Sequence, residues 1–67
     1  MILEFRGEKK QYPDNLTVEQ WLDFAGIPNK EVALVQVNAK DVPPNKRETH
    51  PLSDGDCISL LYFLGDR

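Results

Sequence analysis

The chain has 67 residues and a mass of 7.7 kDa, which allow one small domain, because a second hydrophobic core would have too few residues to bury it. That length excludes most free-standing enzymes, and the net charge of −3, with a pI near 4.9, argues against a nucleic-acid backbone as the main partner. No long apolar run is present to support a membrane span or a secretory signal peptide.

The first segment predicts a β-hairpin. Residues 1–6 alternate as in a strand, with Leu3 and Phe5 on one face. We expect a turn at Gly7-Glu8, because glycine at the first central position supplies the positive φ of such a turn. The return strand, residues 9–12, is polar except for Tyr12, which suits the edge of a sheet.

A short helix follows, and both of its ends are marked. Thr17 and Gln20 form a capping-box pattern, in which each side chain bonds to the backbone of the other residue. Gly26 predicts a left-handed C-terminal cap, with Ile27 folding back beyond it. The apolar positions at helical spacing predict one buried face: Val18, Trp21, Leu22 and Ala25.

Residues 32–37 predict a strand with Ala33, Val35 and Val37 on one face and Val32, Leu34 and Gln36 on the other. A turn follows at residues 38–41, in which Asn38 rather than Ala39 is expected to take any left-handed conformation. Val42 begins a very short strand. Residues 43–51 hold three prolines and no apolar period, which predicts a loop.

The last strand, residues 57–64, carries the most information about function. If Ile58 and Leu60 face the core, then Leu61 and Phe63 face outward, where we expect them to lie near Ile2 and Leu34. A contiguous exposed apolar cluster in a small protein is typical of a binding surface. The alternative is a strand buried on both faces, with the loop of residues 43–51 folded over its outer side.

The order of elements is hairpin, helix, strand, short strand, long loop and final strand. A single helix between hairpin-like units must lie across one face of the sheet. We therefore predict an α+β fold, a single ubiquitin-like β-grasp domain over residues 1–64. Its mixed sheet should have four to five strands and one main helix across one face, followed by a tail at residues 65–67.

The motifs resemble those of the small sulfur-carrier proteins of the ThiS and MoaD type, and the length is closer to that of the thiamine branch. The resemblance covers essentially the whole chain. It consists of Arg6-Gly7-Glu8 after the first strand, Thr17-Val18-x-x-Trp21-Leu22 at the helix start, Val35-Gln36-Val37-Asn38, the turn Leu52-x-Asp54-Gly55-Asp56, and a terminal apolar strand that ends at Gly65.

This resemblance implies a protein substrate rather than an enzyme, with no catalytic residues and no bound cofactor of its own. A ThiF/MoeB-type adenylating enzyme would use ATP to activate the C-terminal carboxylate, which is then converted to a thiocarboxylate. Thiazole synthase or the large subunit of molybdopterin synthase would receive the sulfur. The outward residues Ile2, Leu34, Leu61 and Phe63 would dock on these partners.

The tail departs from the family pattern. The family ends in Gly-Gly, whereas here Gly65 alone matches a tail glycine, and Asp66 and Arg67 occupy the positions of the terminal glycines. Glycine suits a tail that must thread a narrow channel, because it adds no side chain. Two hypotheses therefore stand: a sulfur carrier that acts through its C-terminus, and a β-grasp interaction module that has lost the carrier chemistry.

The remaining candidate residues say less about function. The single cysteine, Cys57, excludes an internal disulfide, and the chain is expected in the reducing cytoplasm. His50 is expected to be a solvated loop residue, and Lys46-Arg47 a solvated basic face that steers acidic partners at most weakly. The scattered acidic residues show no metal-ligand spacing, so no metal site is expected.

Overall fold

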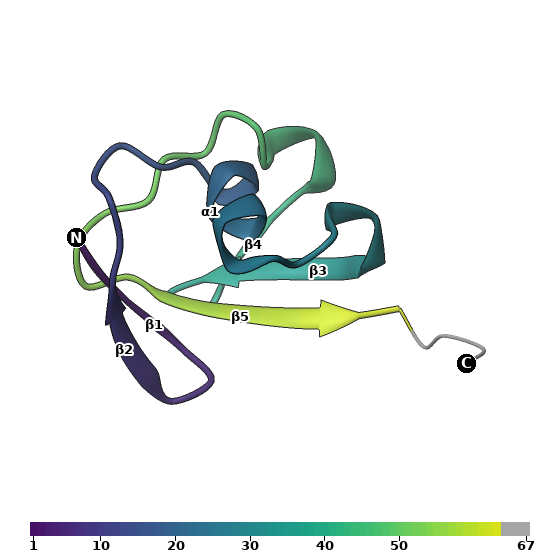
Figure 1. Ribbon diagram of the computed structural model, residues 1–67. Helices are drawn as coiled ribbons and strands as arrows, with labels where there is room; N and C mark the ends of the chain where they lie inside the picture. Colours follow the sequence, from purple (N-terminus) through teal and green to yellow (C-terminus); the bar gives the residue numbers. More distant parts are fainter. Residues whose placement is uncertain (64–67) are drawn as a thin grey trace.

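The computed structural model describes residues 1–63, which form a five-stranded mixed sheet with one helix across one face (Figure 1). The strand order is β2-β1-β5-β3-β4, in which β1 and β5 are parallel and the other neighbours antiparallel. The predicted β-grasp architecture is confirmed. The elements are β1 (Ile2–Phe5), β2 (Glu8–Gln11), α1 (Val18–Ala25), β3 (Val32–Val37), β4 (Lys40–Val42) and β5 (Cys57–Tyr62), with 3-10 turns at Asn29–Glu31 and Pro44–Lys46.

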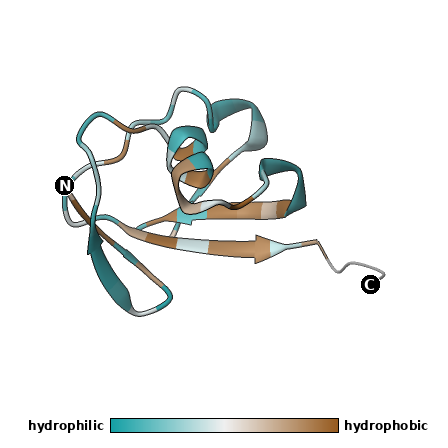
Figure 2. Ribbon diagram, viewed as in Figure 1, coloured by the Kyte–Doolittle hydropathy of each residue, from teal (hydrophilic) through white to brown (hydrophobic). Residues whose placement is uncertain are grey.

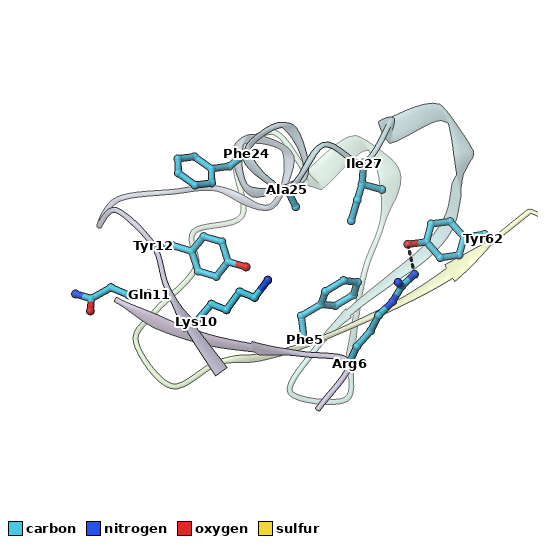
Figure 3. A pocket seen from close by; sticks show the side chains of 9 residues that line it. All are labelled: Phe5, Arg6, Lys10, Gln11, Tyr12, Phe24, Ala25, Ile27 and Tyr62. Carbon is cyan, nitrogen blue, oxygen red and sulfur yellow. Dashed lines mark hydrogen bonds between the residues drawn. The ribbon is translucent and has the colours of Figure 1, made fainter. Parts of the chain in front are cut away.

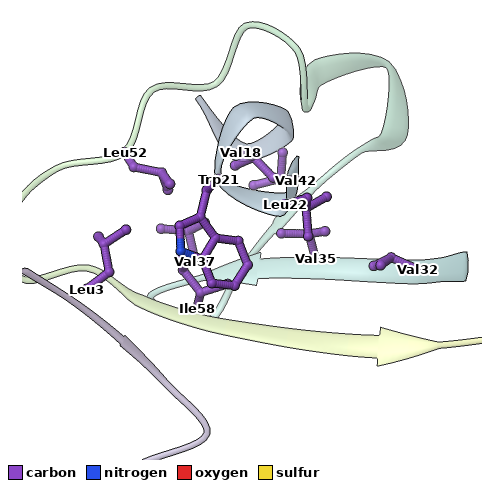
Figure 4. Packing of buried hydrophobic residues seen from close by; sticks show 10 residues of the cluster. All are labelled: Leu3, Val18, Trp21, Leu22, Val32, Val35, Val37, Val42, Leu52 and Ile58. Carbon is purple, nitrogen blue, oxygen red and sulfur yellow. The ribbon is translucent and has the colours of Figure 1, made fainter. Parts of the chain in front are cut away.

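The core lies between α1 and the inner face of the sheet (Figure 4). Trp21 at its centre is fully buried, and the ring of Phe5 meets it edge-on at a centroid distance of 5.0 Å. Apolar residues run along β3 and β5, whereas β2 is hydrophilic throughout (Figure 2). The buried cluster consists of Leu3, Val18, Trp21, Leu22, Val32, Val35, Val37, Val42, Leu52 and Ile58.

Both predicted ends of the helix are confirmed. The Thr17 side chain accepts from the Gln20 N–H at 3.3 Å, and the Gln20 side chain accepts from the Thr17 N–H at 2.9 Å. Gly26 takes a left-handed φ of 76°, and the Ile27 N–H returns to the Leu22 carbonyl. Ala25, which we expected on the buried face, is exposed at the last position of the helix.

Two tight turns differ from the prediction in their details. The first hairpin turns at Arg6-Gly7, with φ of 56° and 78°, rather than at Gly7-Glu8, and Glu8 already pairs with Phe5. Two successive positive φ angles match the twist of the flanking strands better than one. The turn after β3 follows the same rule, since Ala39 is left-handed (φ 69°) as well as Asn38 (φ 54°).

Strand β3 contains an irregularity that changes one assignment. Val35 and Val37 face the core as predicted, but Val32, expected on the outer face with Leu34, is buried. The register between β3 and β5 shifts between Val32 and Leu34. An extra residue at such a bulge reverses the facing of the residues before it, which turns Val32 toward the core.

The segment of residues 43–51 packs beside α1 rather than over the outer side of β5. The backbone carbonyls of Arg47 and His50 accept from the N–H groups of Glu19 and Val18, at 2.9 and 3.0 Å. Arg47 is only 2% exposed, so its assignment to a solvated basic face was wrong. Its side chain donates to the carbonyl and side-chain oxygens of Asn29 and to the carbonyl of Val32. His50 is partly buried rather than fully solvated.

Candidate docking surface and groove

The side chains of β5 alternate between core and solvent, as predicted. Ile58 is 2% exposed, whereas Leu61 and Phe63 are each 60% exposed. The long loop lies on the other side of the sheet, beside α1, and leaves these two side chains uncovered. The alternative of a strand buried on both faces is therefore wrong, and β5 presents apolar side chains on the open face of the sheet.

Leu34 extends this exposed surface onto the neighbouring strand. Leu34 and Leu61 are directly opposite each other in the β3–β5 register, and Leu34 is half-buried. Facing residues on adjacent antiparallel strands have their Cβ atoms ~5 Å apart, close enough for the side chains to pack. Together with Phe63 they form what we call the tail-side patch: Leu34, Leu61 and Phe63.

Ile2 does not join this patch, which corrects the prediction that all four residues lie together. The parallel register puts Glu4 opposite Cys57, and the Gly55 N–H donates to the Ile2 carbonyl at 2.7 Å. Ile2 thus lies level with Gly55, about 20 Å from Leu61 along β5 at ~3.3 Å per residue. The side chain is 44% exposed, but at the opposite end of the open face.

The chain is held to the domain as far as Phe63. Val32 pairs with Tyr62, and the Phe63 N–H donates to the Glu31 carbonyl at 3.1 Å. The described chain therefore ends directly beside the tail-side patch. The predicted carrier tail, Gly65, Asp66 and Arg67, lies outside the described residues.

Other candidate sites can be placed within residues 1–63. Cys57 is exposed, and its N–H donates to the Asn38 side-chain oxygen at 2.9 Å. Among these residues no cluster of three or more His, Cys, Asp and Glu side chains could hold a metal ion. In the same part of the chain, no helix has the length and apolar character needed to cross a membrane.

A second surface feature was not predicted from the sequence. A groove of about 470 Å³ runs between the hairpin and the C-terminal end of α1 (Figure 3). Phe24, 60% exposed, forms part of its wall, and the Tyr12 ring meets it edge-on at a centroid distance of 5.8 Å. We call this the hairpin–helix groove; it is lined by Phe5, Arg6, Lys10, Gln11, Tyr12, Phe24, Ala25, Ile27 and Tyr62. Two features of the sequence could have indicated this groove. Phe24 lies off the apolar stripe of the helix, and Tyr12 is the one apolar residue of an otherwise polar predicted strand.

Comparison with known families settles where this domain belongs. The model of the ThiS family matches residues 2–65, nearly the whole chain. The chain belongs to the ThiS family. The match confirms the family assignment made from the motifs and supports the sulfur-carrier role in thiamine biosynthesis that the resemblance implied.

Individual relatives agree with this assignment. A curated relative, thiazole synthase of Paramagnetospirillum magneticum, is 31% identical over 65 residues, which are 97% of this chain and 20% of that protein. The chain thus spans about a fifth of the length of the curated relative that it matches.

Two solved structures share the fold. The crystal structure of the thiamine biosynthesis protein ThiS from Geobacter metallireducens superposes with a TM-score of 0.83 at 23% identity, covering all of both chains. An NMR structure of a thiamine biosynthesis protein from the same organism gives 0.78 at 23% identity, over 100% of this chain and 88% of that one.

Proposed function

We propose that this ThiS-family chain is a sulfur carrier of thiamine biosynthesis, and that it acts as a protein substrate rather than as an enzyme. The observation that carries the proposal is the match of the ThiS family to residues 2–65, almost the full length of the chain. In this proposal a carboxylate at the end of the tail is activated and then carries sulfur as a thiocarboxylate.

The geometry of β5 supports such a role. A carrier needs a folded domain with a surface that a partner can bind. Its tail should leave the domain close to that surface. The tail-side patch is exposed, and its member Phe63 is the last described residue before the tail. A partner that covers Leu61 and Phe63 would bury apolar surface and at the same time receive the tail.

Two partners follow from this role. An adenylating enzyme of the ThiF/MoeB type would use ATP to form an acyl-adenylate with loss of pyrophosphate, and a sulfur nucleophile would then displace AMP. Thiazole synthase would accept the sulfur. The second partner is supported by the curated relative, since a protein named thiazole synthase contains a segment similar to this chain.

A second candidate function is favoured by Asp66 and Arg67, which stand where the family has terminal glycines. Both residues carry side chains, which a narrow channel that admits only glycine would exclude. In this alternative the domain binds the same partners through the tail-side patch and transfers no sulfur.

Intact-mass spectrometry separates the two functions. The chain is incubated with ATP, a sulfide source and the adenylating enzyme of its own organism, and complex formation is measured in parallel. A carrier gains the mass that corresponds to exchange of one oxygen for one sulfur, and only when ATP is present. An unchanged mass together with a stable complex would identify an interaction module instead.

A tail variant makes the assay sharper. Asp66→Gly with Arg67→Gly places glycines at the two positions where the family has them, without touching residues 1–63. If the natural tail reacts, the variant should react at a similar or higher rate. If only the variant reacts, the natural chain has lost the carrier chemistry, and the proposal is overturned for this protein.

A further inference from the structure

Within residues 1–63, the outer edge of β2 carries backbone groups that pair with no other strand. β2 is the first strand of the sheet, and on its inner side it pairs with β1. Tyr12 exchanges backbone hydrogen bonds with Met1 at 2.7 Å, and hydrogen-bonded pairs alternate along an antiparallel ladder. The N–H and C=O groups of Lys9 and Gln11 therefore point away from β1, ready to pair with another extended chain.

The hairpin–helix groove lies directly beside this edge. Lys10 and Gln11 of β2 form one side, and Phe24 and Ala25 of α1 form the other, as Figure 3 shows. At about 470 Å³ the groove falls within the range of specific binding sites. An extended segment paired to β2 would direct every second side chain into it.

The groove has an apolar wall and a cationic rim. Phe24, 60% exposed, provides apolar surface that the Tyr12 ring covers only in part. Arg6 donates from Nη2 to the Tyr62 hydroxyl at 2.9 Å, and its guanidinium stacks 5.0 Å from the centroid of the Phe5 ring. Within residues 1–63, Arg6 has no carboxylate partner. Lys10 makes only a long ion pair with Glu8, at 3.8 Å between two well-exposed side chains, which contributes little.

We propose that this edge and groove bind an extended acidic-apolar segment of another protein, which adds a strand to β2. Its backbone would pair with Lys9 and Gln11, its apolar side chains would pack against Phe24, and its carboxylates would face Arg6 and Lys10. The local cationic rim formed by Arg6 and Lys10 is complementary to an acidic ligand. This site is separate from the tail-side patch, so both surfaces can be occupied at once.

A second copy of the chain fits this edge less well. Pairing two β2 strands would bring the cationic side chains Lys9 and Lys10 of each copy to one interface, and lysines on an edge discourage such self-association. The same lysines attract an acidic strand. The chemistry of the edge therefore selects a different, acidic partner over self-association.

Amide chemical-shift mapping on the isotopically labelled full chain tests the proposal. The probe is a short acetylated and amidated peptide with a central Val-Ile-Val run followed by Asp-Glu-Asp. We expect shifts at the amides of Lys9, Gln11 and Phe24. Shifts confined to the tail-side patch, or none at millimolar peptide, would overturn the proposal.

Two further comparisons test the binding mode. Lys10→Glu should weaken binding about tenfold, because it replaces attraction by repulsion at the rim. Lys40→Glu, the same charge change on the exposed opposite edge strand β4, should leave the affinity unchanged. A peptide N-methylated at the nitrogens that pair with β2 should lose binding. Equal effects of the two variants, or full binding of the N-methylated peptide, would refute strand addition.

The outcome is independent of sulfur transfer, because the probe contains neither the tail nor a partner enzyme. Loss of peptide binding with normal thiocarboxylate formation would refute this site alone. Peptide binding without thiocarboxylate formation would instead refute the carrier function and leave the site intact.

Discussion

The guanidinium of Arg47 donates a hydrogen bond from Nη2 to the backbone carbonyl of Val32, with a donor-to-acceptor distance of 3.1 Å. Its Nη1 donates to the carbonyl and the side-chain oxygen of Asn29, and its own carbonyl accepts from the Glu19 N–H. One residue of the long loop thus ties together α1, the turn before β3, and the start of β3, which pairs with the strand that leads to the tail.

Arg47→Ala should lower the free energy of unfolding by about 2–3 kcal/mol, because it leaves buried carbonyl oxygens without a donor and removes packed surface. Urea denaturation measures the change. The adjacent Lys46 is exposed, and Lys46→Ala should change stability by about 0.5 kcal/mol or less. Similar losses in both variants would contradict the structural role of Arg47.

Ala39→Gly should raise the free energy of unfolding by about 1 kcal/mol, since Ala39 holds a φ of 69° that costs an L-residue about this much. Ala25→Gly is the matched control, because Ala25 is an exposed helical residue, and the same change there should destabilise by about 0.5–1 kcal/mol. Thermal unfolding of both variants would show shifts of opposite sign. Destabilisation by Ala39→Gly would refute the left-handed turn.

Thr17→Ala should destabilise the domain by about 1 kcal/mol through loss of the capping hydrogen bond to the Gln20 N–H. Thr49→Ala serves as the comparison. The exposed Thr49 hydroxyl donates to the Lys46 carbonyl at 3.4 Å and, unlike Thr17, caps no helix N-terminus. Circular dichroism melts should show a clear loss for Thr17→Ala and almost none for Thr49→Ala; equal melts would argue that the cap contributes nothing.

Leu61→Asp should weaken the proposed complex with an adenylating enzyme by tenfold or more while changing stability by about 1 kcal/mol or less, because the side chain is 60% exposed and lies opposite Leu34 on the open face. Ile58→Asp on the same strand should unfold the domain, since a carboxylate would be buried in the core. Titration calorimetry and denaturation separate the two effects. Unchanged affinity of Leu61→Asp would remove the tail-side patch from the interface.

Local patterns in the sequence predicted the features that depend on short spacing. The capping box, the left-handed glycine at residue 26 and the alternation of Ile58 and Leu61 each follow from a few neighbouring residues. The fold followed from the order of the elements and from the resemblance to a known family, which the comparisons confirmed.

Features that depend on register or on distant partners were not predictable in this way. The order of strands puts β1 beside β5, but only the register shows that Ile2 lies far from Leu61. Val32 faces the core because of a bulge between Val32 and Leu34, and no sequence pattern indicates that bulge. Arg47 looks solvated in a charged loop, and its burial depends on oxygens of Asn29 and Val32, 18 and 15 residues away in the sequence.

The central claim is that sulfur is carried on a tail carboxylate rather than on the exposed thiol of Cys57. The most direct measurement is the intact mass of the natural chain and of Cys57→Ser after incubation with ATP, the adenylating enzyme and, in parallel samples, sulfide or a persulfide donor. The carrier account predicts the same exchange of one oxygen for one sulfur in both proteins. Addition of a whole sulfur atom to the natural chain, lost in Cys57→Ser, would indicate a persulfide and contradict it.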